Sequence, residues 1–580
     1  MHNLSIIRSF IGKYWKSIAL GSCFILLTNS LHVLLPSFVG QGVDLLHDNF
    51  SLRALYRICL LIIIIEFIKG VSRFFMRYII IGASWKIEND IRKRVFEHLL
   101  KLPAKYYDRT RTGDIIARIS NDLLAVRMMV GPAILYSLNA SVLVPLALFF
   151  MFSKDAELSL YAIIPFPFIA VVMYFIAKNI HKYFITVQES YSDISAHVQE
   201  NLNGIHVIKS YVKETSELNK LNNISLDYVQ NNSKVIKLQS LMFPLLDVFA
   251  STSIIILLWA GGKKVITGDT TIGVVVSLIM YIGLLIWPVI AFGWVTALFQ
   301  RGVASMGRIQ EILDEEPEPE MDSKDSDFLE GDISVRNLNY SYNGSFQALS
   351  GISFEVKSGS RIAIVGRTGS GKSTLLGILS GIYEIESGSV FYGGTDICEI
   401  PLSLLRSSIA VIPQETFLFS DTIAENISFG REGADMQIIK FAAARAAISD
   451  EIESFPNGYE TILGERGITL SGGQRQRVAI ARALISESPI IFFDDSLSNV
   501  DTETEKMILN NLKEAVKKKT SFIVTQRLGA IKDSDEIFYM KGGTIIERGT
   551  HEVLMDYDGE YAALFKEQES IESLKDNFTE

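Results

Sequence analysis

Long apolar segments dominate the first half of the chain, and short alternating segments dominate the second half. Six stretches approach the ~20 residues that a helix needs to cross the hydrocarbon of a bilayer. They lie at about 18–39, 58–81, 128–152, 158–176, 243–260 and 274–298. Buried helices of a soluble core are the alternative, but the last stretch contains no charged residue. The pattern therefore predicts an α-helical polytopic membrane domain of six transmembrane helices over residues 1–313.

Positive charges predict the orientation of these helices. The segment between the second and third stretches contains Lys86, Arg92, Lys93, Arg94, Lys101, Lys105, Arg109 and Arg111. The connections near 153–157 and 261–271 carry only Lys154, Lys263 and Lys264. Because cytoplasmic loops are enriched in lysine and arginine, we expect a multi-pass protein of the cell (inner) membrane with both chain ends in the cytoplasm. The first stretch lacks a clear cleavage site, so we interpret it as an uncleaved anchor.

The composition changes sharply at residues 314–331, which are acidic and contain two prolines. Such a segment is typical of a solvated linker. Beyond it, over residues 332–568, short β-rich runs alternate with helical stretches, as in an α/β domain. Residues 569–580 then form an acidic C-terminal tail. The second half of the chain is therefore expected to be an α/β domain.

Residues 366–373 fit the pattern G-x-x-x-x-G-K-[ST] between an apolar run and a helical stretch, the order that a P-loop requires. Backbone amides at a helix start favour phosphate, Lys372 would reach the β/γ-phosphates, and Ser373 would ligate Mg²⁺. The predicted cofactors are therefore ATP and Mg²⁺. The loop residues expected to contact ATP are Gly366, Arg367, Thr368, Gly369, Ser370, Gly371, Lys372, Ser373 and Thr374.

A second nucleotide motif is the apolar run 490–493, which ends in Asp494 and Asp495. Asp494 at the end of such a strand is expected to hold Mg²⁺ directly or through water.

The net charge of −10 and the lack of a concentrated basic face make a nucleic-acid partner unexpected. With 580 residues, of which 48% are hydrophobic, the chain exceeds a single soluble core.

Further motifs resemble the ATP-binding-cassette (ABC) family across residues 332–568. Residues 470–478, LSGGQRQRV, are similar to the family signature, an N-terminal helix turn. The resemblance implies that Ser471, Gly472, Gly473 and Gln474 contact ATP held by an opposite subunit in a head-to-tail dimer. It also implies that Tyr342 stacks on adenine. Gln414 resembles the glutamine that joins Mg²⁺ and the attacking water to the membrane domain, so the expected metal ligands are Ser373, Gln414 and Asp494.

Two positions depart from the family pattern at the predicted catalytic residues Asp494, Asp495 and Gln526. Asp495 stands where competent members have glutamate, and Gln526 stands where they have histidine. An aspartate carboxylate lies ~1.5 Å back from the water, a shift that costs roughly 10²-fold in rate. We therefore expect this chain to bind ATP well and to hydrolyse it slowly. Its signature could still complete a competent site on a partner. Residues 498–501 resemble the D-loop, the family segment that couples the two ATP sites.

The membrane half resembles the exporters of the same family. Residues 106–122 and 200–211 are similar to the two cytoplasmic loops that carry coupling helices. The implied fold is a type IV ABC exporter-like membrane domain followed by a P-loop cassette, working with a second ABC half-subunit. Residues 126–132 further resemble bacterial heterodimeric multidrug exporter subunits, whose partner would carry Glu and His at the two catalytic positions.

The implied function is ATP-driven export of amphipathic compounds by alternating access. The cargo would be a small molecule, a lipid or a peptide, and membrane lipid surrounds the protein. One alternative is a homodimeric lipid or peptide exporter with slow hydrolysis. Another is an ATP-gated regulatory subunit that moves no cargo.

Four charged residues within the second stretch bear on cargo. Glu66, Lys69, Arg73 and Arg77 are offset by 3, 7 and 11 residues and share one helical face. They either line a cationic cavity for anionic or amphipathic cargo, or Glu66 pairs with Lys69 while the arginines extend to the interface.

Overall fold

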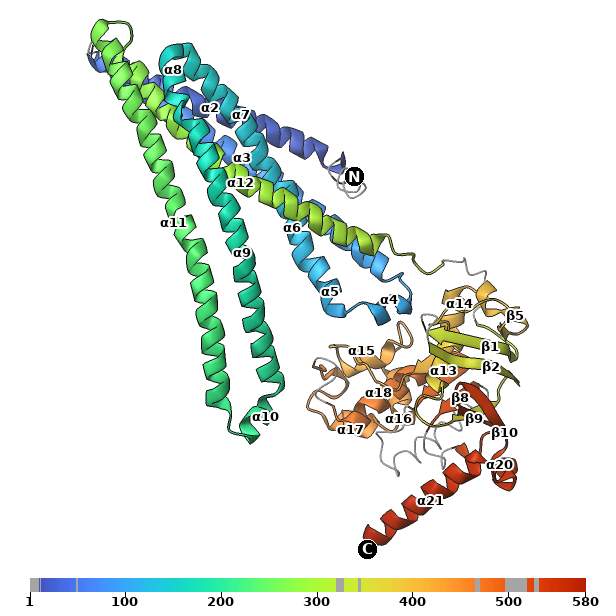
Figure 1. Cartoon of the computed structure of the whole chain (residues 1–580). Coiled ribbons are helices and arrows are strands. Elements are labelled where there is room, and N and C mark those ends of the chain that lie inside the picture. The colour runs from blue at the N-terminus through green and yellow to red at the C-terminus, as the bar shows by residue number, and fades with distance from the viewer. Residues whose placement is uncertain are drawn as a thin grey trace. The chain divides into compact units, whose positions relative to one another are not determined.

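The computed structural model describes residues 10, 12–47, 51–319, 328–342, 346–464, 470–495, 519–525 and 531–579. They form two compact units, which Figure 1 shows together. The first unit comprises Met1–Lys101 and Thr110–Glu316, and the second comprises Leu102–Arg109 and Pro317–Glu580. The segment 102–109, which the sequence assigns to the membrane domain, is thus grouped with the second unit.

The first unit is helical, and each predicted apolar stretch lies within its helices. These are α2 (Trp15–His47), α3 (Leu52–Leu99), α5 (Thr112–Ala117), α6 (Leu123–Met128), α7 (Ile134–Lys154), α8 (Ala156–Ile163), α9 (Pro165–Asn203), α10 (Ile205–Ser210), α11 (Glu214–Thr267) and α12 (Ile272–Leu313). Two π-helical turns, η1 (Arg118–Asp122) and η2 (Met129–Ala133), join α5, α6 and α7 into one continuous helical segment.

Five helical segments of the described chain have the length and hydropathy of membrane spans: Trp15–His47, Thr112–Lys154, Ala156–Asn203, Glu214–Thr267 and Ile272–Leu313. The remaining span of the prediction corresponds to α3, which has 48 residues but carries charges within its apolar run. The sequence left two interpretations of these charges, a cationic cavity or a pair between Glu66 and Lys69. The structure contains the ion pair, with Lys69 Nζ 2.5 Å from Glu66 Oε1. The predicted helical membrane domain is confirmed.

At the end of the unit marked by α8, the helices pack around a common apolar core. Buried residues of α2, α7, α8, α11 and α12 form it, among them Val33, Met151 and Leu257. The buried Tyr281 hydroxyl donates to the Val33 carbonyl at 2.8 Å, which satisfies both groups in this apolar setting.

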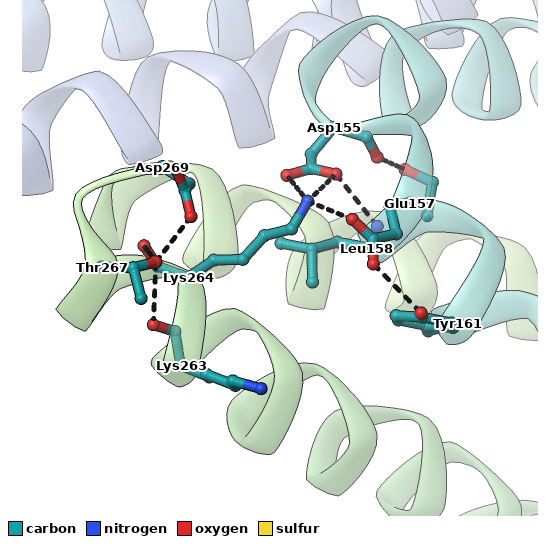
Figure 2. A network of polar contacts seen from close by, with 9 residues as sticks. Asp155, Glu157, Leu158, Tyr161, Lys263, Lys264, Thr267 and Asp269 are labelled. Carbon is teal, nitrogen blue, oxygen red and sulfur yellow. Dashed lines mark hydrogen bonds and ion pairs between the residues drawn. The ribbon is translucent and has the colours of Figure 1, made fainter.

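A polar network fastens α11 to the turn between α7 and α8 at the same end (Figure 2). Lys264 Nζ lies 3.0 Å from Asp155 Oδ2 and 2.8 Å from Glu157 Oε2. Asp155 also caps α8, because its carboxylate accepts from the Leu158 amide at 3.0 Å. Lys264 therefore joins the end of α11 to Asp155, the N-cap of α8, and to Glu157 in the first turn of α8.

Toward α10, the helices separate into two groups within this unit (Figure 1). α9 and α11 run side by side, where Asn231 Nδ2 donates to Ser190 Oγ at 3.1 Å. Ion pairs connect the other group. Arg127 Nε lies 2.8 Å from Glu88 Oε2, and Arg308 Nε donates to Asp122 Oδ2 at 2.9 Å. These contacts join α3, η1, α6 and α12, whereas α10 has no buried residue.

The second unit contains α4 (Ala104–Arg109) and the α/β domain. Among the described residues a six-stranded sheet has the order β10-β9-β3-β8-β7-β6, and a four-stranded sheet has the order β2-β1-β4-β5. The strands are β1 (Ile333–Tyr342), β2 (Phe346–Val356), β3 (Arg361–Val365), β4 (Val390–Tyr392), β5 (Thr395–Asp396), β6 (Ile409–Ile412), β7 (Ile490–Asp494), β8 (Thr520–Val524), β9 (Glu536–Lys541) and β10 (Thr544–Gly549).

Helices cover the larger sheet on both faces because its strands are apolar on both. On β7, Ile490 and Phe492 belong to one buried cluster, and Ile491 and Phe493 belong to another. Successive side chains of a strand point to opposite faces, so the clusters mark the two sides of the sheet. The helices are α13 (Lys372–Leu379), α14 (Leu402–Ser407), α15 (Ile423–Ser428), α16 (Met436–Arg445), α17 (Ser449–Ser454), α18 (Gly472–Leu484), α20 (His551–Tyr557) and α21 (Glu560–Thr579), with 3₁₀ turns η3 (Ile397–Glu399) and η4 (Gly458–Glu460).

Candidate nucleotide site

Four parallel strands that lie side by side bring many of the predicted site residues to one place. The order β3-β8-β7-β6 brings together the carboxyl ends of these strands, where ligands bind in open α/β sheets. A cavity of about 190 Å³ opens there. Its lining consists of Thr368, Gly369, Ser370, Gly371, Lys372, Ser373, Thr374, Gln414, Asp494, Asp495 and Val524.

The loop after β3 depends on glycine at its junction with α13. Gly371 caps α13 with φ +97°, a left-handed conformation that glycine adopts without steric cost. A Cβ atom there would lie 2.7 Å from Leu349 Cδ2 and 2.8 Å from the Ala348 carbonyl oxygen. The sequence pattern of the P-loop therefore reflects both backbone conformation and close packing.

Lys372 lies beneath this loop and is only 8% exposed. Its Nζ donates to the carbonyl oxygens of Gly366 at 2.8 Å and Arg367 at 3.0 Å. Burial lowers the pKa of the Lys372 ammonium, and the nearby carboxylates of Asp495 and Asp494 oppose this shift. A negative phosphate next to this ammonium would stabilise its charged form.

Asp494 faces the same cavity from the end of β7. Its Oδ1 accepts from the Ser373 hydroxyl at 2.9 Å. Burial raises the pKa of the Asp494 carboxyl, whereas the hydrogen bond from Ser373 lowers it. With Gln414 in the lining, the cavity offers hydroxyl, amide and carboxylate oxygens, which are the ligands that Mg²⁺ prefers. These residues fit a magnesium ion.

Asp495 has a left-handed backbone, with φ +44°, and its amide donates to the Val524 carbonyl at 2.9 Å. Aspartate and asparagine tolerate this region better than longer side chains do. The residue is 7% exposed, and it lines the cavity beside Lys372. Gln526 and the D-loop at 498–501 lie outside the described residues.

The signature residues occupy the start of α18. Ser471 is the N-cap, and its hydroxyl accepts from the Gln474 amide at 3.2 Å. The Gln474 side chain accepts from the Ser471 amide at 2.8 Å, which completes a capping box. Ser471 is exposed, and the lining given above includes no residue from 471–474. These groups therefore lie outside the lining of the chain's own P-loop cavity.

Tyr342, the predicted adenine-stacking residue, ends β1 within an aromatic trio. Its hydroxyl lies 3.1 Å from Thr374 Oγ1 on α13. Its ring meets Tyr340 edge-to-face at a centroid distance of 5.2 Å and Tyr383 at 5.6 Å. The sequence interpretation missed Tyr340 and Tyr383. Alternation along β1 could have indicated Tyr340, but no local signal links Tyr383 to Tyr342.

Gly377 on α13 makes room for this trio. A Cβ atom at Gly377 would lie 2.6 Å from Tyr383 Cε2. Because Thr374 and Gly377 are three residues apart, they share one face of the helix. The helix that begins at the P-loop therefore also supports the ring of Tyr342.

Comparisons with known proteins agree with this geometry. Residues 18–289 match the family "ABC transporter transmembrane region", and residues 349–498 match the family "ABC transporter". The chain is 34% identical over 565 residues to the "Probable multidrug resistance ABC transporter ATP-binding/permease protein YheI" of Bacillus subtilis (strain 168), covering 97% of this chain and 96% of that protein. It is 32% identical over 537 residues to the "ATP-dependent lipid A-core flippase" of Vibrio cholerae serotype O1, covering 92% of each.

A solved structure shares the fold of both units. The structure of a bacterial Atm1-family ABC exporter with ATP bound has a TM-score of 0.75 and 25% identity to this chain, with 97% of this chain and 99% of that chain covered. These relatives, the two family matches and the P-loop cavity together show a multi-pass membrane protein with an ATP-binding domain in one polypeptide. The chain therefore belongs to the ABC transporter family, as an ATPase-driven transporter of the fused half-transporter type.

Proposed function

We propose that this chain is one half of an ATP-driven exporter of amphipathic, drug- or lipid-like compounds, and that its own ATP site hydrolyses slowly. The observation that carries the proposal is Asp495 at the glutamate position of the cavity, in a chain whose signature Ser471 is intact and exposed. Relatives named for multidrug resistance and for lipid A-core flipping support amphipathic cargo.

Each predicted residue has a defined part in binding ATP. In the cavity, the loop amides and Lys372 hold the phosphates, and outside its lining Tyr342 stacks on adenine. A magnesium ion held by Ser373, Gln414 and Asp494 would neutralise phosphate charge as it develops. Burial shifts the pKa of Lys372 down and that of Asp494 up, so the triphosphate and the metal each stabilise a charged group that burial disfavours.

The chain works with a second half-subunit. The exposed capping box of α18 presents the Ser471 hydroxyl and the amides of Gly472 and Gly473 at a helix start, where a γ-phosphate binds well. Because these groups lie outside the chain's own cavity, the ATP they contact belongs to the partner. We infer a partner with glutamate and histidine at the positions of Asp495 and Gln526, in a head-to-tail arrangement.

Orientation follows the positive charges of the sequence. Both chain ends and the cassette lie in the cytoplasm, beside the basic segment that contains Arg92 and Arg94. ATP-driven closure of two cassettes would then turn the cargo cavity from the cytoplasmic to the outer side, with ATP supplying the differential affinity between the two states.

Hydrolysis by the purified chain tests the weak site. Alone, the chain should turn over ATP about 10²-fold more slowly than it does with its partner, because the shorter carboxylate of Asp495 holds the attacking water poorly. The variant Asp495→Glu/Gln526→His should recover most of this loss in the isolated chain. Steady-state phosphate release measures both.

Fast hydrolysis by the isolated wild-type chain would contradict the proposal and favour a homodimer. ATP-dependent cargo uptake into inverted vesicles separates a transporter from a regulatory subunit. Uptake is expected with the partner present, and its absence in the presence of normal ATP binding would support the regulatory alternative.

The aromatic trio gives a separate prediction about nucleotide affinity. Gly377→Ala should weaken ATP binding about three- to tenfold, because the added methyl displaces Tyr383 from the helix and loosens the Tyr342 ring. Turnover at saturating ATP should not change. Tyr383→Leu should behave in the same way, and Tyr383→Phe, which keeps the ring, should bind ATP like the wild type. Unchanged affinity in both Gly377→Ala and Tyr383→Leu would exclude a supporting role for the trio.

A further inference from the structure

A cavity of about 610 Å³ lies along the hairpin of α2 and α3, apart from the nucleotide site. We call it the α2–α3 groove. Ser17 lines it from α2, and Phe74, Arg77, Tyr78, Trp85 and Lys86 line it from α3. None of the residues used in the nucleotide site contributes to its lining.

Aromatic side chains form one wall of the groove. Phe74, Tyr78 and Trp85 are offset by 4 and 11 residues, so they follow one face of α3 over ~16 Å. This length is close to the ~15 Å of hydrocarbon in one leaflet. The Phe74 and Tyr78 rings stack with centroids 5.9 Å apart, and these side chains are 62% and 70% exposed. The space beside Gly82 is open, because no atom lies within 4 Å of a Cβ placed there.

Two cationic residues flank this aromatic wall. Arg77 and Lys86 are nine residues apart, which places them on opposite sides of the stripe. Within the described part of the chain, neither forms an ion pair, and the Arg77 guanidinium has only a 3.4 Å contact to the Tyr136 hydroxyl. In contrast, the Arg127 guanidinium lies over the Trp85 ring at 3.9 Å and pairs with Glu88. The groove therefore offers unneutralised positive charge.

The groove also lies at the basic edge of the predicted spans. The apolar run of α2 begins directly after Ser17, and charged residues resume on α3 at Lys86. Just beyond them, Lys13 Nζ lies 2.6 Å from Asp90 Oδ2, which fixes the two helices at the same level. An apolar wall thus meets cations where the lipid hydrocarbon gives way to headgroups. Basic pockets between membrane helices at this level bind anionic headgroups.

We propose that the α2–α3 groove binds an anionic phospholipid. Its acyl chain lies against Phe74, Tyr78 and Trp85, and its phosphate lies against the Lys86 ammonium. The Arg77 guanidinium, ~13 Å further along α3, adds positive charge to the groove and attracts the anionic lipid at longer range. This proposal rests on the membrane domain alone and is independent of the partner and of the cargo.

Native mass spectrometry of the full chain, reconstituted with phosphatidylglycerol or phosphatidylcholine, tests the site. Arg77→Gln/Lys86→Gln should lower bound phosphatidylglycerol at least tenfold and leave phosphatidylcholine unchanged. Lys93→Gln/Arg94→Gln is the matched control, because it removes two exposed positive charges of α3 outside the groove and should retain the lipid. Arg77→Lys/Lys86→Arg keeps both charges and should also retain it. Equal lipid retention in the first and control variants would overturn the proposal.

A crosslinking experiment identifies the occupant directly and does not depend on removing a charge. With a benzophenone amino acid at Tyr78, illumination in phosphatidylglycerol membranes should add the mass of one phospholipid to the chain. A product with the mass of two polypeptides would show that a protein surface covers the groove, and it would overturn the lipid assignment.

Discussion

Lys372→Ala is expected to abolish ATP binding to this chain and to stop ATP-driven transport. The substitution removes the buried ammonium from the floor of the P-loop cavity and leaves the carbonyls of Gly366 and Arg367 without their donor. Losing a preorganised electrostatic contact of this kind costs roughly 10²- to 10³-fold in rate. Photo-crosslinking of labelled ATP to the membrane-inserted protein measures binding, and phosphate release measures turnover.

Lys541→Ala provides the matched control for that experiment. Lys541 belongs to the same unit, but it is exposed and pairs with Glu560 at 2.6 Å, so its removal should cost little. Membrane insertion should be normal in both variants, because neither residue lies in a span. If labelled ATP remained on the Lys372→Ala protein at the wild-type level, the P-loop assignment would be wrong.

Hydropathy predicted the membrane half well because lipid imposes a length and composition on every span. It did not predict how far the helices continue beyond the bilayer. The stretch 243–260 is part of α11, which runs from Glu214 to Thr267. The extension is polar and packs against α9 through contacts such as the hydrogen bond from Asn231 to Ser190. Contacts between residues that are distant in sequence leave no periodic signal.

Local motifs predicted most residues that line the P-loop cavity, because a P-loop pattern requires a particular backbone over a few residues. The spatial order of the strands, which brings Gln414 and Val524 to the same cavity as Lys372, comes from tertiary packing. Tyr383 was missed for the same reason, since its role depends on the space left by Gly377. The predicted linker also makes a tertiary contact that its composition does not indicate. Both side-chain oxygens of Glu318 accept hydrogen bonds from Arg406 at 2.7 Å, although the composition predicted a solvated segment.

The sequence motif also does not indicate the left-handed backbone conformation of Asp495. From the sequence, aspartate at this position indicated only a shorter carboxylate. The structure adds that φ is +44°, a conformation in which aspartate or asparagine is less strained than glutamate. Asparagine at this position would therefore remove the carboxylate charge and leave the backbone undisturbed, which makes it a clean substitution for a functional test.

The largest asymmetry is expected between Ser471→Arg and Asp495→Asn, each co-expressed with the partner half-subunit. In the proposed head-to-tail dimer, Ser471→Arg places a bulky cation where the exposed start of α18 would contact the partner's ATP, so transport should stop. If the chain's own site hydrolyses slowly, as proposed, Asp495→Asn alters only that weak site, and transport should fall less than about tenfold. Cargo uptake into inverted vesicles measures both.

Ser471→Arg also removes the N-cap of α18, a loss of about 1 kcal/mol in stability, and this effect must be separated from the loss of function. Thr550 caps α20 in the same unit, where its hydroxyl accepts from the Val553 amide, so Thr550→Arg removes a comparable cap outside the P-loop cavity and the signature. Transport should survive in Thr550→Arg if the effect of Ser471→Arg arises at the partner's ATP. Equal loss of uptake in Ser471→Arg and Asp495→Asn would mean that Asp495 is a working catalytic base, and that both sites of the dimer must hydrolyse ATP for transport.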